Sequence, residues 1–155
     1  MRKIDLIVVH CSDSDDSLDI GLKQIKEWHT LPPPKGNGWS DVGYHFIIRR
    51  NGKIELGRKL SDIGAHVKGF NSRSIGICTV GRSRFTERQY RTLYGLLRAL
   101  KREFKLGVDQ VKGHYELDPN KTCPNLNMDW IRAEVLFDGE IEQDVKEALD
   151  VAKRP

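Results

Sequence analysis

The sequence predicts an α/β domain in which helices flank a mixed central sheet. Apolar segments typical of buried strands alternate with segments whose apolar residues recur at helical spacing. A chain of 155 residues has the usual length of one domain. Hydrophobic residues make up 38% of the chain, which is enough to build a core. We therefore expect one compact domain over residues 1–137 and a helical extension over residues 138–155.

Four segments have the pattern of strands. Residues 4–11 are β-branched and apolar and lead into a turn rich in Ser and Asp. Residues 75–80 form a second such run, and residues 108–113 form a short third one. Residues 44–56 predict a β-hairpin with a type I′ turn, because the Asn-Gly pair at its centre suits a turn in which both central residues need positive φ.

Helical periodicity marks the remaining elements. A short amphipathic helix is expected over about residues 20–30 and ends before a run of three prolines. Thr86 and Gln89 form a capping-box pattern that predicts a helix over about residues 87–105. Two more helices are expected near the C-terminus, separated by an Asp-Gly break. The last of them has an acidic outer face and could either pack on the body or form a partner surface.

The charge of the chain is unevenly distributed. The formal net charge is +4, but residues 138–155 are acidic, so residues 1–137 carry a clear basic excess. The basic excess of residues 1–137 is compatible with nucleic acid or an anionic cell-envelope polymer as a partner. Alternatively, the excess belongs to an ordinary charged surface that binds no such partner. No apolar run approaches the roughly 20 residues that span a bilayer. Asp5 interrupts the only apolar stretch near the N-terminus, so we expect no signal peptide and synthesis in the cytosol.

Scattered polar residues near the ends of the expected strands are the candidates for chemistry. The chain lacks the local motifs of zinc proteases, serine hydrolases and nucleotide-binding proteins. Two histidines and one cysteine thiolate suffice to hold a zinc ion whose fourth position stays open to water. Only the fold can bring such distant residues together. The candidates are His10, Tyr44, His66, His114, Lys121 and Cys123.

Each candidate also has a structural explanation. A lone histidine at a strand end is more often a hydrogen-bonded structural residue than a metal ligand. Cys11 and Cys78 lie in apolar segments and are expected to be small core residues. His29 and His45 are expected to be structural as well. Three cysteines, an odd number, in a chain without an expected secretory signal argue against a disulfide framework.

An ordered series of motifs, which spans roughly residues 4–132, resembles a known family. These residues resemble the zinc-dependent N-acetylmuramoyl-L-alanine amidases of the phage-lysozyme type, which are related to the peptidoglycan recognition proteins. The resemblance implies a mixed, mainly five-stranded sheet flanked by helices. The motifs are Val9-His10-Cys11-Ser12, Trp28-His29, Asp41-Val42-Gly43-Tyr44-His45-Phe46, Gly64-Ala65-His66-Val67-Lys68-Gly69, Asn71, Ser74-Ile75-Gly76-Ile77, Gly113-His114 and Lys121-Thr122-Cys123-Pro124.

The resemblance also implies a reaction and a role for seven residues. The reaction is hydrolysis of the amide bond between N-acetylmuramic acid and L-alanine, with one zinc ion as cofactor. The oxyanion formed on the way would be stabilised by the hydroxyl of a tyrosine and the ammonium of a lysine. The matching positions are His10, His114 and Cys123 for the zinc ligands, Tyr44 and Lys121 for the catalytic pair, and His66 and Asn71 for the lining of the substrate groove.

The biological setting implied by the resemblance is host lysis by a phage or prophage endolysin. Such a protein acts on peptidoglycan, is expected to be a monomer, is cytoplasmic as made and reaches the cell wall on lysis. A bacterial wall-remodelling amidase would use the same chemistry, and a non-catalytic peptidoglycan-binding module is the alternative from another class. Because binding-only relatives characteristically lack the cysteine ligand, Cys123 favours an enzyme. An RNA polymerase is a partner of some relatives, but no residue pattern identifies that surface, and no nucleic-acid-binding array is present.

Overall fold

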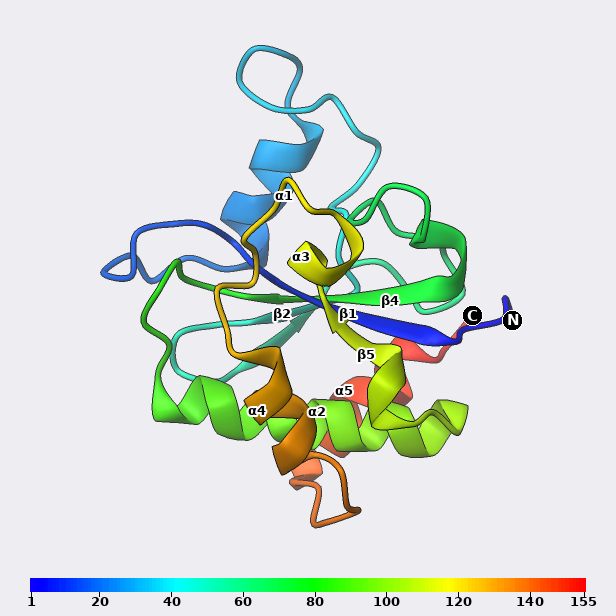
Figure 1. Cartoon of the computed structure of the whole chain (residues 1–155). Helices are drawn as coiled ribbons and strands as arrows, with labels where there is room; N and C mark the ends of the chain where they lie inside the picture. The colour runs from blue at the N-terminus through cyan, green and yellow to red at the C-terminus, as the bar shows by residue number, and fades with distance from the viewer.

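A mixed sheet of five strands lies at the centre of the computed structural model, which describes residues 1–155 (Figure 1). The strand order is β3-β2-β4-β1-β5. Parallel pairing joins β1 to β4 and β5 and joins β2 to β4, and only β2 and β3 pair antiparallel. The predicted α/β architecture with a mixed five-stranded sheet is confirmed. The strands are β1 (Leu6–Cys11), β2 (Phe46–Ile48), β3 (Ile54–Leu56), β4 (Ser74–Thr79) and β5 (Val111–Gly113).

Four of the five helices occupy segments in which the sequence predicts them. The short helix His114–Leu117 was not predicted, and Val108–Gln110, expected to begin a strand, form a 3₁₀ turn. The predicted capping box of the longest helix is present, because Thr86 accepts a hydrogen bond from the backbone of Gln89 and the Gln89 side chain accepts one in return. No helix of the structure has the length and apolarity needed to cross a membrane. The helices are α1 (Leu22–Thr30), α2 (Glu87–Phe104), α3 (His114–Leu117), α4 (Met128–Glu134) and α5 (Gln143–Ala152), with 3₁₀ turns at Asn71–Arg73 and Val108–Gln110.

The hairpin between β2 and β3 is present, but its turn differs from the predicted type I′. Gly52 alone has positive φ, at 85°, and Asn51 is absent from the positive-φ residues. The backbone N–H of Gly52 donates to the carbonyl of Arg49, and the Asn51 side chain accepts a hydrogen bond from the N–H of Lys53. The loop is therefore one residue longer than a two-residue hairpin, and only its last residue needs the left-handed region.

The main core lies between the sheet and the layer formed by α2 and α5, which run beneath it in Figure 1. The buried side chains of Val145, Leu149 and Ala152 attach α5 to this core. A hydrogen bond from the N–H of Leu60 to the carbonyl of Ala152 adds a backbone link of 3.0 Å. The last helix thus packs on the body of the domain, while the expected division at residue 137 stays a prediction.

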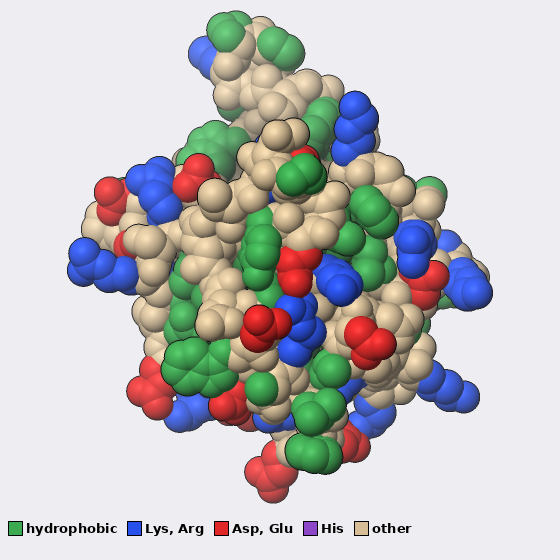
Figure 2. Space-filling view, viewed as in Figure 1, with side chains coloured by type: hydrophobic (Ala, Val, Ile, Leu, Met, Phe, Trp, Pro, Cys, Tyr) green, Lys and Arg blue, Asp and Glu red, His purple; other side chains and the backbone are tan.

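The opposite face of the sheet carries smaller apolar clusters and the polar candidates. Along β1, Ile7 and Val9 join the main core, whereas Val8 packs with Leu6 and Val67 on the other side. Since side chains alternate along a strand, His10 emerges on the side of Val8. On the side shown in Figure 2, Lys and Arg side chains are interspersed with Asp and Glu, so the basic excess forms no continuous patch in this view.

Candidate metal centre

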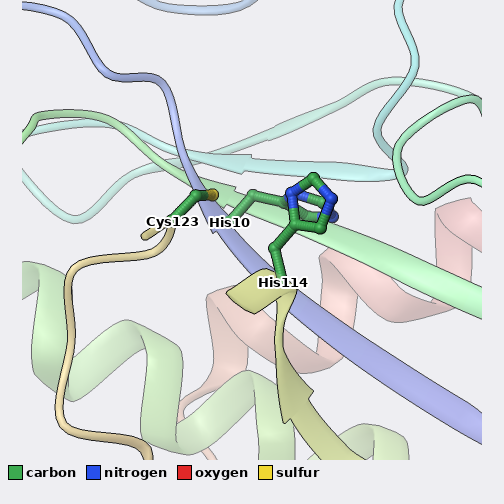
Figure 3. Close-up of side chains that lie close together, drawn as sticks. All are labelled: His10, His114 and Cys123. Carbon is green, nitrogen blue, oxygen red and sulfur yellow. The ribbon is translucent and has the colours of Figure 1, made fainter. Parts of the chain in front are cut away.

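Three of the predicted residues converge at one end of the parallel strands. His10 lies near the end of β1, and His114 directly follows β5, which pairs with β1 so that Val9 lies opposite Gly113. Cys123 belongs to the loop after α3. The potential ligand atoms of the three side chains all lie within 4.8 Å of one another, and Figure 3 shows the side chains grouped together. This arrangement matches the ligand set of a zinc site with one open position.

The backbone and side chains around Cys123 hold its loop in place. The N–H of Cys11 donates to Cys123 Sγ at 3.1 Å, and the N–H of Tyr115 donates to the Cys123 carbonyl at 2.8 Å. Two residues further on, the amide of Asn125 donates to the carbonyl of Arg82 at 2.6 Å. The sulfur is therefore positioned by β1 on one side and by the loop after β4 on the other.

A separate group of contacts fixes the start of α3, where His114 lies. Glu116 accepts a hydrogen bond of 2.9 Å from the N–H of Gly113. Arg132 of α4 donates two hydrogen bonds to the same carboxylate, at 2.7 and 2.9 Å. A bidentate contact of this kind fixes both partners in direction as well as distance. The position of His114 thus depends on α4 as well as on β5.

The electrostatic surroundings favour neutral histidines. Burial, with the nearby His66 and His114 adding to it, lowers the pKa of His10 well below its ordinary value. Burial and the charge of Lys121 also lower the pKa of His114. Without a metal, the hydrogen-bonded thiol of Cys11 and burial raise the pKa of Cys123. The histidines can therefore bind a cation at neutral pH, whereas Cys123 must first lose its proton.

Tyr44 and Lys121 lie beside this cluster. The Tyr44 ring lies 5.1 Å from the His10 ring between centroids. Burial, with the neighbouring thiol of Cys78 adding to it, raises the pKa of Tyr44 well above its ordinary value, so its hydroxyl stays protonated. Lys121 is exposed on the loop that carries Cys123. Tyr44 thus offers a hydroxyl donor, and Lys121 offers an exposed positive charge.

All of these groups line one groove with a volume of about 800 Å³. The seven residues that the resemblance implied, including His66 and Asn71, all contribute to its surface. His66 and Asn71, however, use their polar atoms in contacts within the protein. His66 Nδ1 lies 2.8 Å from His10 Nε2, and Asn71 Oδ1 accepts hydrogen bonds of 2.9 Å from the N–H groups of His66 and Val67.

Two aromatic residues outside the seven candidates, His29 and Trp39, also line the groove. The His29 ring lies 4.9 Å from the Trp39 ring and 5.4 Å from the Tyr44 ring, and its Nδ1 accepts a hydrogen bond from the N–H of Gly43. The structural role expected for His29 is thus correct but incomplete, because the same ring forms part of the groove. Helical spacing gave no sign of this, since the groove wall is built by a loop that folds back onto α1.

The other histidine and the cysteines behave largely as predicted. His45 is fully buried, its Nδ1 accepts a hydrogen bond from the N–H of Gly76, and its Nε2 lies 2.9 Å from the Asp62 carbonyl. Burial lowers its pKa to about 4. All three cysteines are free, and Cys78 belongs to an apolar cluster. Cys11 is buried too, as predicted. Its backbone N–H also donates a hydrogen bond to Cys123, a role that its place in an apolar segment did not predict.

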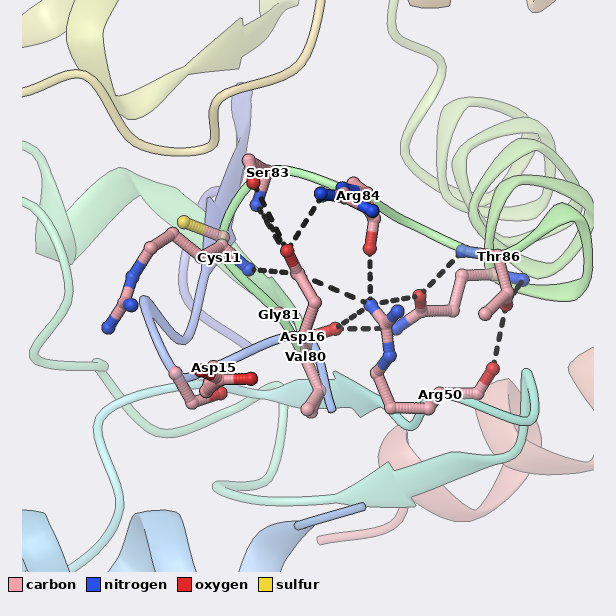
Figure 4. A network of polar contacts seen from close by, with 12 residues as sticks. Cys11, Asp15, Asp16, Arg50, Val80, Gly81, Ser83, Arg84 and Thr86 are labelled. Carbon is pink, nitrogen blue, oxygen red and sulfur yellow. Dashed lines mark hydrogen bonds and ion pairs between the residues drawn. The ribbon is translucent and has the colours of Figure 1, made fainter. Parts of the chain in front are cut away.

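A polar network beside the centre joins the loop after β1 to the loop after β4 (Figure 4). The carboxylate of Asp16 accepts hydrogen bonds from the N–H groups of Arg82, Ser83 and Arg84, at 2.8, 3.3 and 3.2 Å. These bonds lower the pKa of Asp16 to about 2. Arg50 completes the network by donating to the carbonyl of Arg84 at 2.7 Å. The network fixes the segment to which Asn125 is bonded.

Comparisons with known proteins identify the relatives of this chain. The family model described as N-acetylmuramoyl-L-alanine amidase matches residues 1–126. The endolysin of Enterobacteria phage K11 is 39% identical over 133 residues, which cover 80% of this chain and 83% of the endolysin. The endolysin of Klebsiella phage KP32 is 41% identical over 130 residues, which cover 79% and 81%. Among solved structures, the N-acetylmuramoyl-L-alanine amidase LysC from Clostridium intestinale URNW matches with a TM-score of 0.75 and 29% identity over 86% of each chain.

Proposed function

The chain belongs to the N-acetylmuramoyl-L-alanine amidase family, and we propose that it acts as a zinc-dependent phage endolysin. Its reaction is hydrolysis of the amide bond between N-acetylmuramic acid and L-alanine of the peptidoglycan stem. The observation that carries the proposal is the convergence of His10, His114 and Cys123 at the groove of a chain with endolysin relatives.

The three converging residues fit a zinc ion. Two imidazoles and one thiolate form a preferred zinc ligand set, and the spacing of their ligand atoms allows one ion to contact all three. Three protein ligands leave one position for water or substrate. When bound, zinc polarises a carbonyl and makes a water nucleophilic near neutral pH. His10, His114 and Cys123 would hold it.

Tyr44 and Lys121 are proposed to stabilise the negative charge that develops on the carbonyl oxygen. As water adds to the amide carbon, this oxygen accepts a hydrogen bond from the Tyr44 hydroxyl and approaches the Lys121 ammonium. A preorganised donor of this kind contributes about 3–4 kcal/mol to the transition state. When the C–N bond breaks, the amine of L-alanine takes a proton, either from Tyr44 or from a water molecule.

His66 and Asn71 are proposed to form part of the wall against which the substrate lies. Both line the groove, although their polar atoms are bonded within the protein. Peptidoglycan is the proposed partner, and we expect the protein to act as a monomer. It would be made in the cytoplasm and reach the cell wall on lysis, as the endolysin relatives suggest.

Digestion of sacculi tests the proposal. Purified protein is incubated with sacculi of the meso-diaminopimelate type, with chelator and after return of zinc, and the released fragments are identified by mass spectrometry. We expect free stem peptides with an L-alanine amine, lost with chelator and restored by zinc, and none from Cys123→Ser. New reducing sugar ends would indicate a glycosidase, and binding without release would indicate a recognition module.

A further inference from the structure

His66 lies directly behind His10 and is almost as deeply buried. The exposed fraction of the residue is 9% for His66 and 1% for His10. His10 Nε2 and His66 Nδ1 are 2.8 Å apart, and the two rings are nearly perpendicular, at 84°. On its far side, His66 Nε2 lies 3.1 Å from the hydroxyl of Ser74. These contacts form a row from His10 through His66 to Ser74.

One proton lies between the two rings, and its location decides what His10 can do. If His66 Nδ1 carries it, His10 Nε2 is the acceptor, and neutral His10 then has its own proton on Nδ1. Neither nitrogen of His10 would then be available to a metal. If His10 Nε2 carries the proton, His10 Nδ1 keeps a free lone pair, and His66 must carry its own proton on Nε2, where Ser74 accepts it. Only the second arrangement leaves His10 a ligand.

The surrounding structure holds the His66 ring in one position against His10. Asn71 Oδ1 accepts hydrogen bonds from two consecutive N–H groups, those of His66 and Val67. Gly76 of β4 lies under the ring, where an added Cβ would come within 2.6 Å of His66 Cγ. Ser74 lies on the same strand and is fully buried. The ring is thus fixed from its backbone, from below and at its far nitrogen.

We propose that His66 is a positioning residue for the metal ligand His10, which it keeps in the tautomer with the proton on Nε2, and that Ser74 in turn orients His66. The inference rests on the proposed zinc site. Metal-bound histidines usually donate their second ring N–H to a partner that fixes the ring and its tautomer. That partner is commonly a carboxylate or a carbonyl, and here a neutral imidazole takes its place.

Two variants whose new side chains are similar in shape to each other separate the contribution of the hydrogen bond from that of the packing. His66→Asn places Oδ1 close to the position of the Nδ1 acceptor, whereas His66→Leu has a similar shape without an acceptor. The measurement is the zinc dissociation constant of the full chain, obtained by competition with a chromophoric chelator. We expect His66→Leu to bind zinc about 10–100-fold more weakly and His66→Asn to recover most of that loss. Equal affinities of the two variants would overturn the proposal.

The tautomer itself can be read in the wild-type protein, which covers the case in which a variant does not fold. Long-range ¹H–¹⁵N spectra of the zinc-loaded chain should show protons on Nε2 of both His10 and His66. A proton on His10 Nδ1 would overturn the proposal. If the wild-type chain takes up no zinc, the proposed metal site fails; if it binds zinc and His66→Leu binds equally tightly, only the positioning role fails.

Discussion

The N–H of Cys11 donates to the sulfur of Cys123 at 3.1 Å, although 112 positions separate the two residues in the chain. The neighbouring residue on β1, His10, supplies another of the grouped side chains. Two consecutive residues of β1 thus contribute to the same group: His10 contributes its side chain, and Cys11 contributes its backbone N–H. A small shift of β1 along β5 would disturb both functions together.

Replacing the proposed sulfur ligand should remove metal and activity together. In Cys123→Ser we expect zinc affinity to fall by more than the 10–100-fold typical of a change next to a ligand, with loss of peptide release. Cys11→Ala is the matched control, because it removes a neighbouring thiol but keeps the N–H that contacts Cys123. Metal analysis after dialysis and the sacculus assay measure both effects. Full zinc content and rate in Cys123→Ser would contradict the ligand assignment.

Removing either proposed oxyanion donor should reduce turnover but leave the metal in place. For Tyr44→Phe and for Lys121→Ala, we expect kcat to fall about 10²–10³-fold, since each variant loses a donor to the developing oxyanion. Zinc content should equal that of the wild type, because neither side chain belongs to the ligand group. Steady-state kinetics with a soluble muropeptide provides the rate. Loss of zinc from either variant would show that the residue supports the metal instead.

Zinc affinity should rise with pH. Burial lowers the pKa values of His10 and His114, so both are neutral above pH 6.5 and release no proton there. The pKa of Cys123 is raised, so binding must displace its proton throughout the neutral range. We expect the apparent affinity to increase about tenfold per pH unit between pH 6.5 and 8. Chelator competition at three pH values tests this, and a flat profile would argue against a thiolate ligand.

His45 should account for part of the stability that the metal-free protein loses in mild acid. Its pKa is about 4 in the folded chain against an ordinary value of 6.5, so between these values the unfolded chain binds the extra proton. The free energy of unfolding should be unaffected by this group above pH 6.5 and fall by about 3 kcal/mol on the way to pH 4. Urea unfolding at pH 7.5 and pH 4, with chelator present, should show a smaller loss for His45→Asn than for the wild type. Equal losses would mean that His45 titrates normally in the folded state.

The buried amide of Gln89 should matter more to stability than the helix cap beside it. Its Nε2 donates to the Val80 carbonyl at 2.8 Å, and its Oε1 accepts from the N–H of Thr86 and from Arg50. Gln89→Leu keeps the volume but removes the partner of the Thr86 N–H and one of the two donors to the Val80 carbonyl, so we expect a loss of about 1–3 kcal/mol in urea unfolding. Thr86→Ala should cost about 1 kcal/mol. A loss below that of Thr86→Ala would show that water replaces the amide.

The sequence predicted the elements better than it predicted their contacts. The strands and α2 have local signals, namely apolar runs, periodicity and the Thr86 capping box. The approach of His10 to His114 depends on the parallel register of β1 and β5, so only the resemblance to a family could suggest it. The Asn-Gly pair predicted a hairpin but not the length of its loop. The bonds of Asp16 to backbone groups more than 60 positions away have no local signal at all.

Because α2 and α5 lie on the face of the sheet opposite the groove, durability and catalysis can be engineered separately. The side chains that attach these helices to the sheet belong to the main core, and none of the residues of the groove lies in either helix. Substitutions that improve packing or helix propensity in this layer can raise the melting temperature without altering the groove. A heat-resistant antibacterial enzyme could therefore be sought by redesigning α2 and α5 alone.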